Sequence, residues 1–250
     1  MKTVLWGSLL FVGTAISIAI AACAPTTTTS ETTNQPSPDD SPVNISTTQT
    51  TSSFDEALYL FANSDVKELI NRGKYQSGLD HYEQVGQTAK KPDGERYESF
   101  FTGTNGNDTV QGFGKGEHAH FAGVKIEIVD QKGDPFPLRP VSLGKGEMDV
   151  LMGTTEGGNE FLIGSFITSV NPKPEPFYVG QGDADYARIQ NFTPTKDSII
   201  VAGEPAQYNI EPVDGNVRIS TNGDLVAIVE GVTQLKVGEV VKDYGVFTLK

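Results

Sequence analysis

Two carboxylates in the C-terminal half of the chain have a spacing that suits cation binding. Asp183 and Asp185 flank Ala184, so both side chains face one side in an extended strand, and in a turn both can reach one ion. Two close carboxylates repel each other, and a bound cation or a proton relieves that repulsion. The pair is a candidate metal site, although a solvated acidic loop would contain the same residues.

Two histidines raise a second possibility. His118 and His120 are separated by one residue, and in a strand both imidazoles would point to the same face, which is a start for a zinc site. Two ligands do not complete such a site, and the sequence places no third ligand beside them. Histidines without a chemical role remain the alternative.

Residues 103–111 carry the clearest motif, which reads GTNGNDTVQ. It resembles the glycine-rich nonapeptide of the RTX (hemolysin-type) calcium-binding proteins. In that family six residues form a turn whose carbonyl oxygens point inward, glycines permit left-handed backbone angles, and aspartate adds a hard anionic oxygen. The last three residues form a short parallel strand, so the resemblance implies that Val110 enters the core.

The same resemblance implies Ca²⁺ as the bound ion. In the family each ion lies between two successive turns, and one turn supplies half of a site. Asp108 is then the first expected ligand. The backbone carbonyls of Gly103, Asn105 and Gly106 would contribute further oxygens.

Three further copies of the motif depart from the family pattern. Glu117 takes the place of aspartate in the copy after Gly112, and Asp149 lies one position out of register in the copy after Gly144. In the fourth copy, after Gly157, Asn159 stands where the family has aspartate. Asp149 and Glu117 are therefore the next expected ligands, but eroded copies also leave open that the ion has been lost.

The resemblance extends beyond the repeats. Residues 177–192, 197–200 and 223–232 are similar to an element that follows such repeats in surface proteins of photosynthetic bacteria. Residues 63–86 are similar to a short helical module of the same proteins. Together these segments imply membership of a cyanobacterial-type group of surface lipoproteins with degenerate repeats.

The N-terminus reads as a lipoprotein signal. A charged start and an apolar run over residues 4–22 precede Cys23, the only cysteine. The run Ile20 to Cys23 resembles a bacterial lipobox, which implies cleavage after residue 22 and lipid on Cys23. We expect an extracytoplasmic protein anchored to a membrane by this lipid, with the outer membrane or cell surface favoured. An ordinary signal peptide with an incidental cysteine is the alternative.

Composition restricts the partners. With 32 acidic and 19 basic side chains the net charge is −13, so the chain should not bind nucleic acid, which carries the same sign. A protein or polysaccharide partner at the cell surface is not identified by any motif. No nucleophile elbow or phosphate-binding loop occurs in the sequence, and we expect a protein that is not an enzyme.

Four segments follow from these patterns: a signal peptide at 1–22, a Thr/Ser/Pro-rich tether at 23–53, a helical module at 54–99 and an RTX-like β domain at 100–250.

Ser53 and Glu56 form a capping-box pattern, and Ser77 would cap a third helix. Strand patterns cover residues 121–129, 161–170, 177–180, 186–192, 198–202, 207–210, 217–220, 225–230 and 246–249. The expected fold is mainly β, a degenerate parallel β-roll or β-solenoid that passes into mixed or antiparallel strands after a small helical unit.

The function expected from the sequence is that of a lipid-anchored, extracytoplasmic, calcium-binding protein with a structural or surface role. One alternative is a structural or adhesive β module that has lost the ion. Another is a secreted hydrolase on a β-solenoid scaffold, because the two carboxylates of a glycosidase are distant in sequence and leave no local motif.

Overall fold

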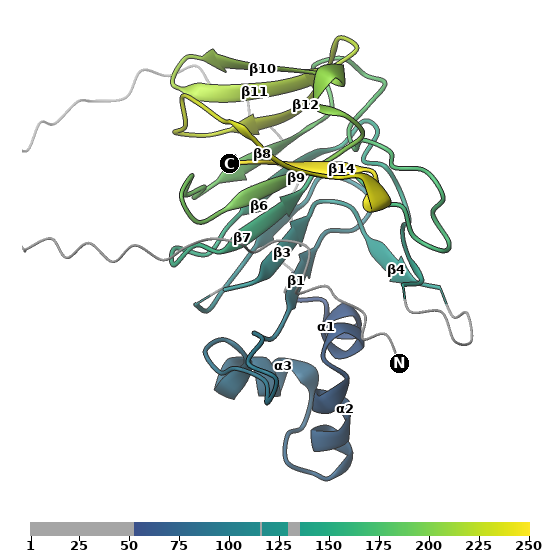
Figure 1. Ribbon diagram of the computed structural model, residues 1–250, viewed down its shortest axis with the longest axis vertical. Helices are drawn as coiled ribbons and strands as arrows, with labels where there is room; N and C mark the ends of the chain where they lie inside the picture. The colour runs from purple at the N-terminus through teal and green to yellow at the C-terminus, as the bar shows by residue number, and fades with distance from the viewer. Residues whose placement is uncertain (1–52, 116, 130–135) are drawn as a thin grey trace, which may run out of the picture.

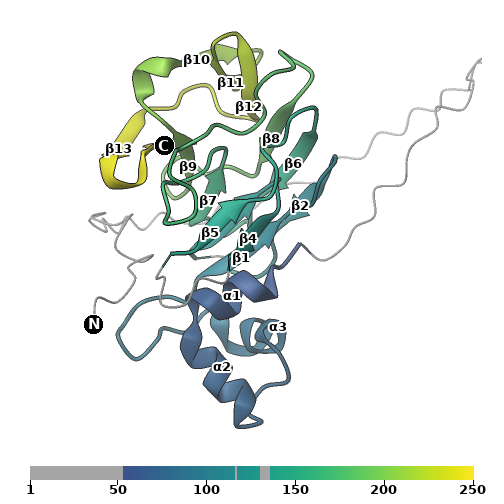
Figure 2. The ribbon, with the colours of Figure 1, turned by 90° about the vertical axis from the view of Figure 1, so that its right-hand side faces the viewer.

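The computed structural model describes residues 53–115, 117–129 and 136–250. In this part of the chain a small helical unit lies at one end of two β-sheets (Figures 1 and 2). Strands of the two sheets alternate along the chain, so the backbone winds as a parallel β-solenoid of about three turns and then ends in antiparallel strands. The expected fold class is confirmed. Cys23, the predicted signal peptide and the predicted tether up to residue 52 lie outside the described residues.

The helical unit comprises residues 53–86. Its first helix is capped by Asp55, whose carboxylate accepts the Leu58 N–H at 3.0 Å. The prediction that Ser53 caps this helix is wrong. Ser53 lies in an extended segment, and its carbonyl accepts the Thr102 N–H at 2.8 Å. Ser77 caps the third helix as predicted. The elements are α1 (Glu56–Ala62), α2 (Ser64–Asn71), α3 (Gly78–His81) and the π-helical turn η1 (Tyr82–Gly86).

Two six-stranded sheets form the β domain. Sheet 1 has the strand order β1-β3-β7-β9-β14-β13 and sheet 2 the order β2-β6-β8-β12-β11-β10. Pairing is parallel from β1 to β9 and from β2 to β12, and antiparallel beyond them. Sheet 1 contains β1 (Ser99–Thr102), β3 (Ala119–Ala122), β7 (Asn159–Leu162), β9 (Ser198–Ala202), β13 (Val237–Val241) and β14 (Val246–Leu249). Sheet 2 contains β2 (Thr109–Gln111), β6 (Met148–Met152), β8 (Tyr186–Gln190), β10 (Tyr208–Val213), β11 (Asn216–Thr221) and β12 (Asp224–Val229).

The core is built from side chains at matched register positions of successive strands. Phe101, Phe121 and Phe161 are aligned in sheet 1, and their ring centroids are 5.1 and 5.2 Å apart. We call these three residues the phenylalanine ladder. Sheet 2 contributes the aligned and buried side chains of Val110, Leu151, Ile189 and Val229. Val110 therefore enters the core, as the RTX resemblance implies.

The turns between the sheets form two edges of the roll. The first edge carries the chain from sheet 1 to sheet 2 and consists of the turn 103–108 and the longer connections from β3 to β6 and from β7 to β8. The first of these connections includes the antiparallel pair β4 (Ile126–Ile128) and β5 (Leu138–Pro140). The second edge returns the chain to sheet 1 and has only short turns, which precede β3, β7 and β9.

Candidate functional site

Acidic residues of two successive turns meet at the first edge. Thr109 of β2 pairs with Val150 of β6, so the residues before them, Asp108 and Asp149, are neighbours. The Asp108 N–H donates to Asp149 Oδ1 at 2.8 Å. The first and third copies of the glycine-rich motif are therefore stacked on each other.

Hydrogen bonds already hold both carboxylates. Asp108 Oδ2 accepts the Thr104 N–H at 2.7 Å and the Thr104 hydroxyl at 3.0 Å. Asp149 is fully buried, and its Oδ2 accepts the Tyr178 hydroxyl at 2.7 Å. Donors from the protein thus occupy positions that a cation would otherwise fill.

Two carboxylate oxygens at this edge have no such donor. Glu147 Oε2 and Asp185 Oδ1 are both buried without a hydrogen-bond partner. Asp185 is fully buried, and its other oxygen accepts the Gly146 N–H at 3.0 Å, which places the carboxylate against the turn that contains Glu147. A buried carboxylate oxygen without a donor is costly, and a proton, a water molecule or a cation would satisfy it.

Each ionised carboxyl group of the first edge also makes the ionisation of its neighbours less favourable. Burial raises the pKa of Asp149 to about 6, and the charges of Glu147 and Asp108 act in the same direction, while the bonds from Tyr178 and the Asp108 N–H lower it. Burial likewise raises the pKa of Glu147, with Asp108 adding to the effect and the Gly106 N–H opposing it. These groups would gain from a nearby positive charge at neutral pH.

The other predicted ligands are distributed differently. Gly103, Asn105 and Gly106 lie in the first-edge turn, where Gly106 has a φ of 115° that favours glycine. Glu117 lies on the second edge and pairs with Arg96 at 2.5 Å. Asp183 is exposed and pairs with Arg218 at 3.0 Å, so it does not share a site with the buried Asp185. The first edge thus gathers Asp108, Asp149 and Asp185, but neither Glu117 nor Asp183.

Among the described residues of the second edge, no buried carboxylate oxygen lacks a hydrogen-bond partner. Asp197 Oδ1 accepts the Asn159 N–H at 2.9 Å and its side-chain amide at 3.1 Å, and Asp197 Oδ2 accepts the Thr193 N–H at 2.7 Å. Asn159 Oδ1 in turn accepts the Thr154 N–H and hydroxyl at 3.0 and 2.9 Å. Hydrogen bonds therefore hold these turns of the second edge together. The first edge, where two buried carboxylate oxygens have no donor, is the candidate site for an ion.

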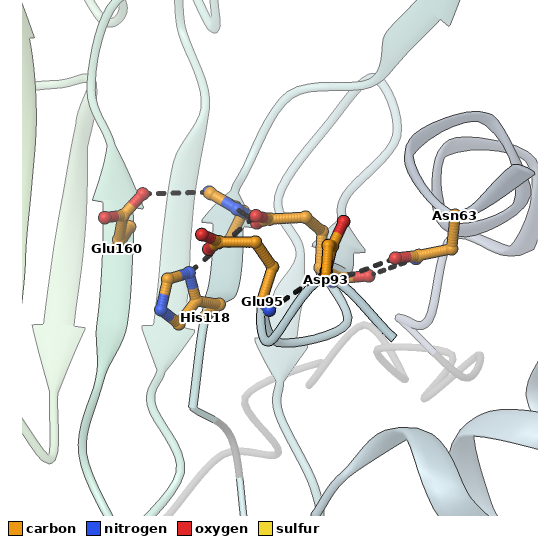
Figure 3. A network of polar contacts seen from close by, with 7 residues as sticks. Asn63, Asp93, Glu95, His118 and Glu160 are labelled. Carbon is orange, nitrogen blue, oxygen red and sulfur yellow. Dashed lines mark hydrogen bonds and ion pairs between the residues drawn. The ribbon is translucent and has the colours of Figure 1, made fainter. Parts of the chain in front are cut away.

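A second polar cluster lies on sheet 1 and connects β3 and β7 with the segment that directly precedes β1 (Figure 3). His120 Nε2 is 2.5 Å from Glu98 Oε2, and His120 Nδ1 is 3.1 Å from Glu160 Oε2. His118 Nδ1 lies 3.7 Å from Glu98 Oε1. Glu98, His120 and Glu160 are buried, and we call these three residues the buried ion triad.

The triad borders a polar cleft of about 740 Å³. His118 and Glu160 line it together with Arg96, Lys196 and other charged residues from the second edge and from residues 90–96. The lining carries both signs of charge, and Arg96 is paired with Glu117. The histidines anticipated as a start for a zinc site thus lie beside two carboxylates, with His120 held in ion pairs.

Some of these residues were not anticipated from the sequence. Glu147 stands two positions before Asp149 in the third motif copy, so the motif itself contained a signal for it. No sequence pattern around Tyr178 or Glu98 indicates a role for either residue. Each acquires its role through a hydrogen-bond partner on another strand or connection.

Within the described ranges no three His, Cys, Asp or Glu side chains form a group suited to holding a metal ion. A cation at the first edge would therefore depend partly on backbone carbonyls. None of the helices in the described part of the chain combines the length and the apolar character needed to span a bilayer. No protein-family model matches the chain, and no curated protein matches it.

Proposed function

We propose that this protein is a non-enzymatic β-roll of the RTX type that binds Ca²⁺ at its first edge. Asp108, Glu147, Asp149 and Asp185 would supply carboxylate oxygens, and Gly103, Asn105 and Gly106 would supply backbone carbonyls. Ca²⁺ prefers such hard oxygen ligands and accepts irregular arrangements of them. In this role the ion joins successive coils of the roll and does not take part in a reaction.

One observation carries this proposal: in the described part of the chain, the buried carboxylate oxygens without hydrogen-bond donors are those of Glu147 and Asp185, and both lie at the first edge. At the second edge both carboxylate oxygens of Asp197 accept hydrogen bonds from N–H groups of Asn159 and Thr193. Raised pKa values of Asp149 and Glu147 support the same assignment, because a divalent cation would offset the charge that burial disfavours.

Removing calcium tests the proposal through stability. With a Kd of about 10⁻⁴ M, as in extracellular modules, calcium at one hundred times Kd adds about 2.7 kcal/mol to the free energy of unfolding. For a domain of this size that corresponds to a rise in Tm of about 5–10 °C. We expect this rise between chelator and calcium, and a much smaller one with magnesium.

Two variants sharpen the measurement. Asp185→Asn should have nearly the same Tm with calcium and with chelator, because it removes the charge of a fully buried carboxylate that has an oxygen without a donor. Asp183→Asn should keep the full calcium effect, because Asp183 is exposed and paired with Arg218. A wild-type Tm that calcium does not change would refute calcium binding.

The alternative is a structural module that has lost the ion, and a specific observation favours it. Asp108 and Asp149 already accept hydrogen bonds from Thr104, Tyr178 and the Asp108 N–H. In that case hydrogen bonds would hold the turns of the first edge together, as they do at the second edge, but with fewer of the carboxylate oxygens satisfied. The protein would then serve as an inert scaffold at the cell surface.

We further propose that lipid on Cys23 anchors the protein on the extracytoplasmic side of a membrane. Changing Cys23 to Ser should release the protein into the soluble fraction or leave an uncleaved precursor, as judged by membrane fractionation and immunoblotting. A mature-sized, membrane-bound Cys23→Ser product would contradict the anchor.

A further inference from the structure

The N-terminal end of the roll has outermost strands that need cover. β1 is the outermost strand of sheet 1, and β2 is the outermost strand of sheet 2. A parallel solenoid repeats the same edge at every coil, so an uncovered first coil would present unpaired backbone groups to any other strand. Repeat proteins depend on terminal elements that end this repetition.

Residues 53–55 cover the backbone of this end. The Asp55 N–H donates to the Phe100 carbonyl at 2.8 Å, and the Thr102 N–H donates to the Ser53 carbonyl at 2.8 Å. This segment runs antiparallel to β1. The Ser53 hydroxyl also accepts the Gln111 N–H of β2 at 3.3 Å, so one residue contacts both outermost strands.

Aromatic rings of the helical unit cover the open core. Phe101 is the first ring of the phenylalanine ladder, and its centroid lies 5.9 Å from that of Phe54 and 6.2 Å from that of Tyr82. Phe113 completes the cover at 5.3 Å. The Tyr82 hydroxyl donates to the Phe113 carbonyl at 2.9 Å. Figure 1 shows the helices beyond β1, at the end opposite β10 and β11.

Polar contacts fix the unit to the roll at a third place. The Asn63 side-chain amide donates to the Glu98 carbonyl at 2.8 Å, and the Glu98 N–H donates to Asn63 Oδ1 at 3.2 Å. Glu98 belongs to the buried ion triad. The helical unit is therefore attached to the backbone of one residue of the buried ion triad.

We propose that the helical unit is an end cap that keeps a second copy of this chain from pairing with β1. The segment that now lies on β1 is antiparallel to it, and two β1 strands related by a two-fold axis would also be antiparallel. With the cap displaced, two copies can satisfy each other's β1 edges and stack their ladder rings. The occupant is thus a second copy, bound through the first coil.

The opposite end of the roll ends differently. There the sheets change to antiparallel pairing, and the outer strand β13 has a register irregularity between Val237 and Val240. Glu239 lies between them, and charges and bulges of this kind discourage edge pairing. This end therefore needs no helical cover, and it supplies a control surface for the experiment.

The test displaces the cap within the full chain. Phe54→Asp combined with Tyr82→Asp places two charges in the aromatic cover of Phe101. Hydrogen exchange read by mass spectrometry reports whether residues 56–86 lose protection, circular dichroism reports whether the sheets persist, and light scattering after size exclusion reports the mass. A third change, Val240→Asp, blocks the opposite edge as a control.

We expect the unit to lose protection, the β spectrum to persist, and the mass to double as concentration rises, with Val240→Asp making no difference. A folded monomer with an unprotected helical unit would overturn the proposal. So would an unfolded chain, which would make the unit a requirement for stability, or association that Val240→Asp abolishes. Full protection of residues 56–86 in the variant would also overturn the proposal, because the aromatic cover would then not hold the cap in place.

Discussion

Replacing His120 with alanine is expected to lower the free energy of unfolding by about 3–5 kcal/mol, because it leaves two buried carboxylates without their cation. His120 lies between Glu98 and Glu160, at 2.5 and 3.1 Å, and ties the segments of β1, β3 and β7 together. A loss of this size is a large part of the 5–15 kcal/mol that stabilises a typical domain. Urea denaturation followed by circular dichroism measures it.

The matched control is His118→Ala. His118 is 24% exposed and 3.7 Å from Glu98, so its removal should cost less than about 1 kcal/mol. A triple variant, Glu98→Gln with His120→Leu and Glu160→Gln, should recover much of the loss, since it removes the charges together with their cation. If His120→Ala costs no more than His118→Ala, the triad does not stabilise the roll.

The pH dependence of the His120→Ala effect gives an independent check. Burial alone would lower the pKa of His120, but its bonds to Glu160 and Glu98 raise it to about 10, above the ordinary 6.5. Burial would raise the pKa of Glu98, but His118 and His120 lower it to about 2, below the ordinary 4.5. The stabilisation is therefore complete between pH 4.5 and 6.5. It declines as pH rises from 6.5 towards 10 and as pH falls from 4.5 towards 2.

Replacing Phe121 with alanine should have an effect of similar size. Phe121 is fully buried in the middle of the phenylalanine ladder, with Phe101 and Phe161 stacked on its two sides. Truncating a buried phenylalanine removes its transfer free energy and leaves a cavity, which costs about 3–5 kcal/mol. Chemical denaturation with an unchanged m-value would identify the change as a loss of stability alone.

Phe136→Ala serves as the control for this variant. Phe136 is half-buried and meets Phe166 at 6.4 Å and Tyr244 at 5.8 Å, both edge-on and outside the ladder. Its removal should cost about 1–2 kcal/mol, the scale of two aromatic pairs. Equal losses from the two variants would mean that the ladder is not the centre of the core.

Local patterns predicted the parts of the fold that local chemistry determines. The apolar runs at 198–202 and 246–249 coincide with β9 and β14, and Ser77 is the cap of α3. Residues 177–180 were expected to form a strand and do not, because Tyr178 has a φ of 60° and contributes its hydroxyl to Asp149. Tertiary contacts there override a strand-like sequence.

Most of the contacts that the sequence could not predict depend on the register in which the strands pair. His120 and Glu160 lie on paired strands and Glu98 directly precedes β1, and only the parallel pairing of β1, β3 and β7 makes these distant residues neighbours. Asp183 and Asp185 were expected to act together, but one pairs with Arg218 at the surface and the other is buried beside Gly146. No spacing rule within a single segment distinguishes these outcomes.

The connections on the two edges of the roll differ in length, and the longer ones are suitable places to insert a peptide. Every return turn on the second edge is short, whereas the connections from β3 to β6 and from β7 to β8 on the first edge carry many additional residues without disturbing strand alignment. Lengthening a surface loop costs little entropy once its ends are fixed. A foreign epitope placed within such a connection would be displayed at the first edge, while the sheets kept their register.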